Sequence, residues 1–221
     1  MVYFKTTGII LYKKNIQEKS AIIYILTKNL GIIKAIAEGI NASKSKILSI
    51  VQAGNFGKFY LIGEYSKYRL LSFLPYKIPF KVYKKYPYTY LWTLRFLTLF
   101  NFFDISEGFF RFLLEIDKIL LKNPKEFPAL FVYRVLKELG IQPNLENCER
   151  CNINLINSKD IYFKEAKLYC DRCRKIGYEK IERKDYLNII YFLKNKKNKI
   201  NNNSLSLLKK IIKSHLKRIH L

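Results

Sequence analysis

The four cysteines of the chain lie close together in the sequence, at Cys148, Cys151, Cys170 and Cys173. They form two C-x2-C pairs that are separated by residues 152–169. Each pair can supply two thiolates from one tight turn, and two such knuckles joined by a short hairpin complete the tetrahedral shell of zinc. The spacing is typical of zinc ribbons. Because four thiolates leave no open coordination position, the pattern predicts one structural Zn²⁺ and no catalytic metal.

Other uses of these cysteines fit the sequence less well. Two disulfide bonds need an oxidising compartment, and the apolar run at residues 8–11 is too short for a secretory signal, so we expect a cytoplasmic protein. Thioredoxin-like redox chemistry uses a single C-x-x-C at a helix start. Arg150, Arg172 and Arg174 lie in or beside the knuckles, where we expect their charge to lower the pKa of the thiols.

The remaining residues offer little material for catalysis. The chain has two histidines, His215 and His220, which we interpret as part of an exposed basic helix end. It contains neither a P-loop nor a G-x-G-x-x-G motif. Its 17 acidic residues are scattered, which disfavours a carboxylate cluster around Mg²⁺. We therefore predict that the protein is not an enzyme, with a zinc-containing nuclease or hydrolase as the weaker hypothesis.

The charge of the chain indicates a polyanionic partner. Its 41 basic and 17 acidic residues give a net charge of +24, of which +8 falls on residues 1–75 and +11 on residues 141–221. An AT-rich genome explains many lysines but does not remove acidic residues. The longest apolar stretch, residues 91–103, is interrupted by Arg95 and Asn101 and is shorter than the roughly 20 residues of a membrane span. We favour nucleic acid as the partner, rather than a membrane surface.

The elements that must position these groups divide into two parts. Short runs rich in Ile, Tyr, Val, Phe and Leu predict five strands, at residues 7–13, 21–27, 32–37, 56–62 and 68–74. Five closely spaced strands suit a small barrel, most often the oligonucleotide-binding (OB) type when the partner is a nucleic acid, with an SH3-like barrel as the alternative. Helices are then predicted at 88–103, from a cap at Ser106 to about 123, and at 125–139, 183–193 and 205–216.

The predicted fold class is therefore α+β. An N-terminal five-stranded OB-type barrel, residues 1–75, precedes an α-helical domain, residues 76–221, in which a four-cysteine zinc ribbon is embedded at about 141–180. Within the barrel, the loop at 39–46 carries hydroxyl and ammonium groups that bind phosphate oxygens. Aromatic residues nearby, Phe56, Phe59 and Tyr60, would add stacking surfaces. The candidate DNA-binding residues are Lys34, Lys44, Ser45, Lys46 and Lys58.

One block of the sequence resembles a known family. The run from Leu139 to Cys151, L-G-I-Q-P-N-L-E-N-C-E-R-C, is similar to the bacterial RecO family of DNA repair proteins, in which a helix ends in L-G-x-x-P-x-L and leads into the first knuckle. The run T-G-I-I-L at residues 7–11, residues 18–31 and the basic loop from Gly39 to Lys46 resemble the N-terminal part of that family. The family often has a Gly-Gly pair before the second knuckle, where this chain has Glu165 and Ala166.

The resemblance implies a recombination mediator that performs no bond chemistry. Members of the family bind single- and double-stranded DNA, anneal complementary strands, and act with RecR and single-stranded DNA-binding protein to load the RecA recombinase. The resemblance also implies a cytoplasmic, nucleoid-associated location. The alternative from another class is an RNA-binding zinc-ribbon protein, for example in ribosome maturation, which would use the 2′-OH as its handle.

Overall fold

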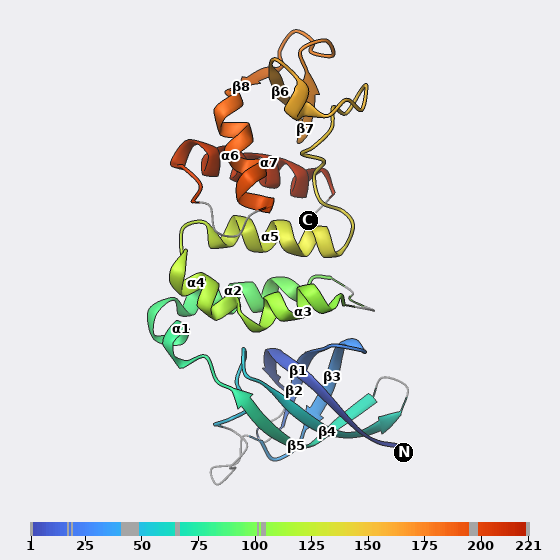
Figure 1. Ribbon diagram of the computed structural model, residues 1–221. Coiled ribbons are helices and arrows are strands. Elements are labelled where there is room, and N and C mark those ends of the chain that lie inside the picture. Colours follow the sequence, from blue (N-terminus) through green and yellow to red (C-terminus); the bar gives the residue numbers. More distant parts are fainter. Residues whose placement is uncertain are drawn as a thin grey trace. The chain divides into compact units, whose positions relative to one another are not determined.

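The computed structural model describes residues 2–16, 18, 20–40, 49–64, 67–100, 102, 105–194 and 199–219 (Figure 1). Contacts divide the chain into two compact units, Met1–Pro124 and Lys125–Leu221. The first unit contains five strands and the four helices that follow them, and the second contains three helices and a small sheet. The domain boundary predicted after residue 75 stays a prediction. None of the helices in the described ranges is both long and apolar enough to cross a membrane.

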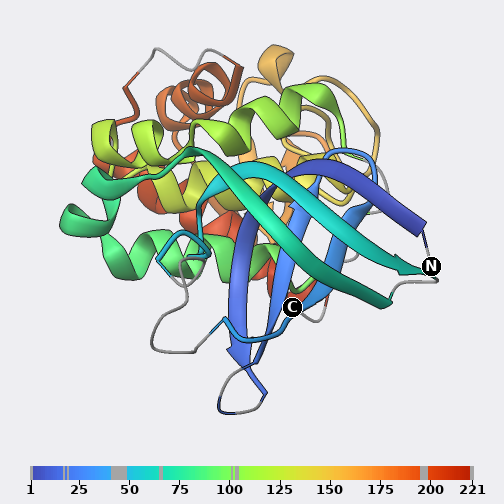
Figure 2. The ribbon, with the colours of Figure 1, turned by 90° about the horizontal axis from the view of Figure 1, so that it is seen from below.

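The first unit is built on a closed barrel with the strand order β1-β2-β3-β5-β4. Its strands, blue to teal in Figure 2, are β1 (Val2–Asn15), β2 (Ala21–Thr27), β3 (Gly31–Ala37), β4 (Phe56–Glu64) and β5 (Lys67–Lys77). The first strand pairs antiparallel with both β2 and β4, and β3 pairs parallel with β5. This arrangement confirms the predicted five-stranded barrel of OB type.

Alternation of side chains explains why these segments form strands. In β2 and β3 every second residue points inward, so that Ile23, Ile25 and Ala35 are fully buried. The side chains between them are on the outer surface, where Tyr24 lies opposite Lys34. The interior is filled by branched aliphatic side chains and by Phe59, whose ring stacks on another core ring with 4.5 Å between centroids. The aromatic residue predicted as a stacking surface at 59 is therefore part of the core.

Four helices complete the first unit: α1 (Phe80–Lys85), α2 (Pro87–Leu97), α3 (Glu107–Leu114) and α4 (Ile116–Lys122). The predicted cap is confirmed, because the Ser106 hydroxyl accepts a hydrogen bond from the Phe109 amide at 3.2 Å. The helix predicted from there to about residue 123 is interrupted at Glu115, and α1 was not predicted. Proline at the first position fixes the start of α2, and the helix ends at Leu97, before the predicted end.

Contacts at Lys77 and at Gly54 help to join the helices to the barrel. Lys77, at the end of β5, forms an ion pair with Asp117 of α4 at 2.5 Å and also donates to the Leu114 carbonyl. Gly54 lies shortly before β4 in the chain and has a positive φ of 83°. Its backbone lies directly against the ring of Tyr90 in α2. Burial raises the pKa of Tyr90 well above its usual value. The close approach leaves no room for a side chain at residue 54.

The second unit contains the helices α5 (Phe127–Glu138), α6 (Arg183–Lys194) and α7 (Asn202–Arg218) and a small sheet. The sheet consists of β6 (Ile161–Lys164), β7 (Lys167–Cys170) and β8 (Glu179–Ile181) in the order β7-β6-β8. A 3₁₀ turn, Leu155–Asn157, precedes it. Gly140, with a φ of 70°, ends α5 as expected from the glycine that follows a helix.

The position of His215 differs from the sequence interpretation. The residue is buried in α7, and its Nε2–H donates to the Ile141 carbonyl at 2.6 Å. It lies on the same face of the helix as Leu208, Ile211 and Ile212, which are also buried. The interpretation of His215 as an exposed residue is therefore wrong, because His215 continues at helical spacing the buried face that Leu208, Ile211 and Ile212 form. His220 lies outside the described residues.

The contact at Gly54 yields a test of how the barrel and α2 pack. A Cβ at residue 54 would lie 2.5 Å from the Tyr90 ring, and φ is in the region that disfavours L side chains. We expect Gly54→Ala to lower the free energy of unfolding by about 1–3 kcal/mol, measured by urea denaturation. Gly108→Ala is the matched control: no atom lies within 4 Å of its Cβ, and alanine is favoured within a helix by about 0.5–1 kcal/mol. Equal stability of the Gly54 variant and the parent would contradict the packing.

Candidate metal centre and nucleic-acid interface

The structure brings the four predicted cysteines together. Their sulfur atoms all lie within 4.8 Å of one another, and the Sγ atoms of Cys151 and Cys170 are 3.6 Å apart. A tetrahedral site with Zn–S bonds of about 2.3 Å requires sulfurs about 3.8 Å apart. All four are free thiols, three of them buried. The donor set and its spacing therefore fit a metal ion with soft-ligand, tetrahedral coordination.

The backbone of each knuckle turns sharply so that its thiols point inward. The first knuckle is closed by a hydrogen bond from the Asn152 amide to the Cys148 carbonyl at 2.9 Å, and Asn152 takes a left-handed φ of 57°. In the second knuckle the Cys173 amide donates to the Cys170 carbonyl at 3.1 Å. The Cys170 amide donates to the Cys148 sulfur at 3.4 Å and so links the two knuckles.

The environment favours a thiolate at Cys148. Burial raises the pKa of this thiol, but the amides of Cys151, Cys170 and Arg150 donate to its sulfur and together lower the pKa to about 6. Burial and the neighbouring thiols raise the pKa of Cys170 and Cys173. The four neighbouring thiols thus all lose their protons only when a bound cation balances the negative charge of the thiolates.

The arginines act differently from the prediction. Backbone amides, rather than guanidinium groups, lower the pKa of Cys148. Arg174 lies over the ring of Tyr162, with 5.2 Å between its Cζ atom and the ring centroid, and donates to the tyrosine hydroxyl at 2.7 Å. Its role in the ribbon is therefore to hold the strand β6 against the loop that follows Cys173.

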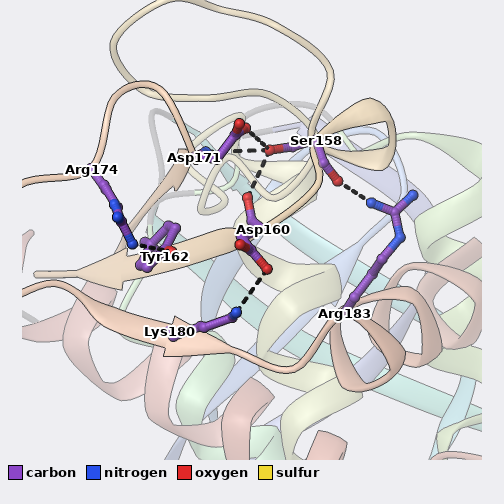
Figure 3. A network of polar contacts seen from close by, with 7 residues as sticks. All are labelled: Ser158, Asp160, Tyr162, Asp171, Arg174, Lys180 and Arg183. Carbon is purple, nitrogen blue, oxygen red and sulfur yellow. Dashed lines mark hydrogen bonds and ion pairs between the residues drawn. The ribbon is translucent and has the colours of Figure 1, made fainter.

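A polar network supports the second knuckle (Figure 3). The single proton of the Ser158 hydroxyl is shared between two acceptors, the Asp171 carboxylate at 2.8 Å and the Asp160 carbonyl at 2.7 Å, and Asp171 lies between two of the cysteines in the sequence. Arg183 of α6 donates to the carbonyls of Ser158 and Ile156, the latter at 2.6 Å. The hydrogen bond from Ser158 lowers the pKa of Asp171. These contacts hold the second knuckle in the orientation that the metal site needs.

A second site lies on the outer surface of the barrel. Residues of β1, β2, β3 and the end of α2 surround a cleft of about 570 Å³. The rings of Tyr12 and Tyr24 are 5.8 Å apart, Arg95 lies 5.1 Å from the first ring, and the Lys34 ammonium lies 5.4 Å from the second. None of the described residues that line the cleft is acidic. The lining consists of Tyr12, Lys14, Tyr24, Ile32, Lys34, Arg95, Thr98 and Phe100.

The predicted DNA-binding lysines do not gather at one place. Lys34 is exposed in the cleft, whereas Lys58 lies on β4, which is not adjacent to β3. There Lys58 and Lys5 both approach the ring of Tyr60, at 5.8 and 5.7 Å from its centroid. The other candidates, Lys44, Ser45 and Lys46, lie outside the described residues. The DNA contacts of all five stay a prediction.

Sequence reasoning missed most of the cleft. Tyr12 and Tyr24 occur within apolar strand runs. Because side chains of a strand point alternately to its two faces, the apolar neighbours that face inward indicate that both tyrosines face outward. Arg95 was noted only as a charge that interrupts an apolar stretch. Its approach to Tyr12 depends on the packing of α2 against β1, which local periodicity does not reveal.

Two family models match the chain. The model "Recombination protein O N terminal" matches residues 1–72, which contain the barrel strands up to β5. The model "Recombination protein O C terminal" matches residues 98–220, which contain all four cysteines. The chain belongs to the RecO family. The expected resemblance is thereby confirmed, and DNA repair is the process in which the family acts.

Several curated RecO proteins are similar over most of the chain. The DNA repair protein RecO of Alkaliphilus metalliredigens is 25% identical over 178 residues, which cover 78% of this chain and 72% of the relative. That of Clostridium perfringens is 26% identical over 204 residues, 88% of this chain and 81% of the relative. That of Caldicellulosiruptor saccharolyticus is 23% identical over 229 aligned residues, 99% and 94% of the two chains.

Because the network around Ser158 positions the second knuckle, we expect metal affinity to depend on residues outside the four-cysteine donor set. We expect Ser158→Ala to weaken metal retention by roughly tenfold, because Asp171 loses its hydroxyl partner and the second knuckle loosens. Competition with a chelator, followed by absorbance of the released metal complex, measures this. Ser206→Ala on the exposed side of α7 is the control and should retain metal like the parent. Unchanged retention in the Ser158 variant would show that the network is dispensable.

Proposed function

We propose that this RecO-family protein is a non-enzymatic recombination mediator. It binds single- and double-stranded DNA, anneals complementary strands and helps to load a recombinase onto coated single strands. The observation that carries the proposal is the basic and aromatic cleft of the barrel, which combines groups for phosphates with groups for bases. By the family resemblance its partners are RecR, single-stranded DNA-binding protein and, indirectly, RecA, in the cytoplasm at the nucleoid.

The lining of the cleft has the chemistry of a single-strand binding site. Lys34 and Arg95 neutralise backbone phosphates, and the paired rings of Tyr12 and Tyr24 offer faces on which bases stack. OB barrels bind oligonucleotides on the surface of their second and third strands, which is where this cleft lies. Such contacts do not depend on the base sequence, as strand annealing requires.

Annealing follows from these contacts without bond chemistry. Neutralised phosphates allow two strands to approach, since the repulsion between their backbones falls. Bases held on tyrosine faces leave their hydrogen-bonding edges available to a complementary strand. A Mg²⁺-dependent cleavage assay tests the remaining enzyme hypothesis, and we expect intact DNA after incubation. Cleavage that is lost on mutation of the chain's own residues would overturn the non-enzymatic assignment.

Zinc is the proposed occupant of the four-cysteine site, with a structural role. The four soft donors at tetrahedral spacing support this choice, and no coordination position remains for a substrate. When bound, the ion joins the two knuckles of the second unit. The barrel cleft belongs to the first compact unit, so the metal and the proposed single-strand site depend on different parts of the chain.

The barrel cleft leads to a test of DNA binding. For single-stranded DNA, we expect Lys34→Ala to flatten the dependence of log affinity on log salt by about 0.7, the value for one lost phosphate contact. Tyr24→Ala should weaken binding by about 1–3 kcal/mol through lost stacking, on every sequence tested. Fluorescence anisotropy with labelled oligonucleotides, at several salt concentrations, measures both effects.

The matched controls are Lys85→Ala and Tyr86→Ala. This pair also places a lysine over a tyrosine ring, at 5.4 Å, but at the C-terminal end of α1 and outside the cleft. Both control variants should bind like the parent. If the control variants lose as much affinity as the cleft variants, the strand does not follow the cleft. RNA of the same sequence is the second comparison, and tighter binding of RNA would favour the ribosome-maturation hypothesis.

The metal site leads to a separate prediction. Protein prepared with zinc should contain about one zinc ion per chain, and Cys148→Ser or Cys170→Ser should release it, measured by elemental analysis. Increased proteolysis within residues 141–180 should accompany the loss, because ribbon folding is coupled to metal binding. A parent protein that holds no metal and contains two disulfide bonds would contradict the assignment.

A further inference from the structure

The loop that follows the last cysteine presents an apolar side chain to solvent. Ile176 is 105% exposed, more than any other large apolar side chain among the described residues. It stands between Lys175 and Gly177, and Gly177 takes a positive φ of 83°. Ile176 contributes nothing to the core of its own unit, and it lines an open hollow together with Tyr162 and Tyr178. An apolar side chain and two aromatic rings at one open hollow indicate a surface that contacts another molecule.

The loop is held firmly although its tip is exposed. At its start Arg174 is anchored to Tyr162 by a hydrogen bond of 2.7 Å. At its end the Tyr178 ring lies against that of Tyr169, with centroids 4.6 Å apart, and the Tyr178 amide donates to the Lys175 carbonyl at 3.3 Å. Residues 174–178 and Tyr162 line an open hollow of about 820 Å³. The tip is thus a fixed projection rather than a free end.

The charge around the tip is positive. The acidic side chains of the neighbouring strands are occupied: Glu179 pairs with Lys210, and Asp160 pairs with Lys180 at 2.9 Å. Arg174 and Lys175 form no ion pair with any described residue. An approaching polyanion therefore meets two cations, Arg174 and Lys175, that directly precede the apolar tip and have no carboxylate partner among the described residues.

This combination is that of a DNA wedge. Proteins that bend or open duplexes insert an apolar side chain between base steps while basic groups hold the adjacent phosphates. A membrane surface would require a broader apolar face than a single residue. Protein interfaces are enriched in aromatic and arginine anchors, which this hollow also contains in Tyr162, Tyr178 and Arg174, so the choice of DNA rests on the positive charge of the loop.

We propose that the loop 174–178 is a second DNA site, in which Ile176 inserts against the base stack of duplex DNA and Arg174 and Lys175 hold the phosphates. This inference rests on the proposed DNA-binding function and extends it from the barrel to the ribbon. A duplex contact in the second unit and a single-strand cleft in the first would allow the protein to bind at a junction between paired and unpaired DNA.

The test uses the full-length, zinc-loaded protein and a duplex that carries 2-aminopurine, whose fluorescence rises when it is unstacked. The parent should raise this fluorescence, and Ile176→Ala should abolish the rise and weaken duplex binding by roughly tenfold. Lys175→Ala should leave part of the rise and flatten the salt dependence for duplex DNA by about 0.9. Binding of a single strand to the barrel should stay within twofold in both variants.

The controls lie in the same ribbon. Ile153→Ala removes another isoleucine, 41% exposed, and Lys159→Ala removes another exposed lysine. Both should behave like the parent. If Ile176→Ala binds and unstacks duplex DNA like the parent while the cleft variants lose single-strand binding, the wedge is refuted and the proposed function stands. If the parent protein binds no DNA of either kind, the proposed function itself fails.

Discussion

Hydrogen bonding along both edges of β1 is the constraint on which the first unit depends. The strand pairs with β2 through its second half and with β4 through its first half, from Val2 opposite Gly63 to Ile9 opposite Phe56. Closure removes the exposed edges of the sheet and encloses the aliphatic core. It also fixes the outward register in which Tyr12 of β1 lies opposite Tyr24 of β2. The cleft is therefore a consequence of how the barrel closes.

The small sheet of the second unit is stabilised without closure into a barrel. Its three-stranded sheet is too small to bury a core of its own, and a network centred on Ser158 and the proposed metal bound by the four cysteines stabilise it. Arg183 connects that network to α6, and the buried hydroxyl of Ser204 in α7 donates to Asp185 of α6 at 2.8 Å. Metal site and helices thus form one continuous structure within this unit.

Local sequence signals predicted what local interactions determine. Short runs rich in branched and aromatic residues indicated all five strands, Ser106 indicated a helix start, and the spacing of the cysteines indicated their cluster. Features that arise from distant packing were missed. Burial of His215 depends on the Ile141 carbonyl, 74 residues away, and the cleft needs Arg95 to reach a ring on β1. The short helix α1 has no side-chain cap that could have marked its start.

The long-range pairing of β1 has a consequence for synthesis on the ribosome. The strand leaves the exit tunnel well before β4, so one edge of the nascent sheet lacks its partner until about residue 64 has emerged. An open edge of this kind recruits other chains. The strand carries lysines at both ends, Lys5 and Lys13 with Lys14, which oppose such pairing because like charges would meet. The same positive charge that suits a nucleic-acid partner thereby protects the unfinished barrel from aggregation.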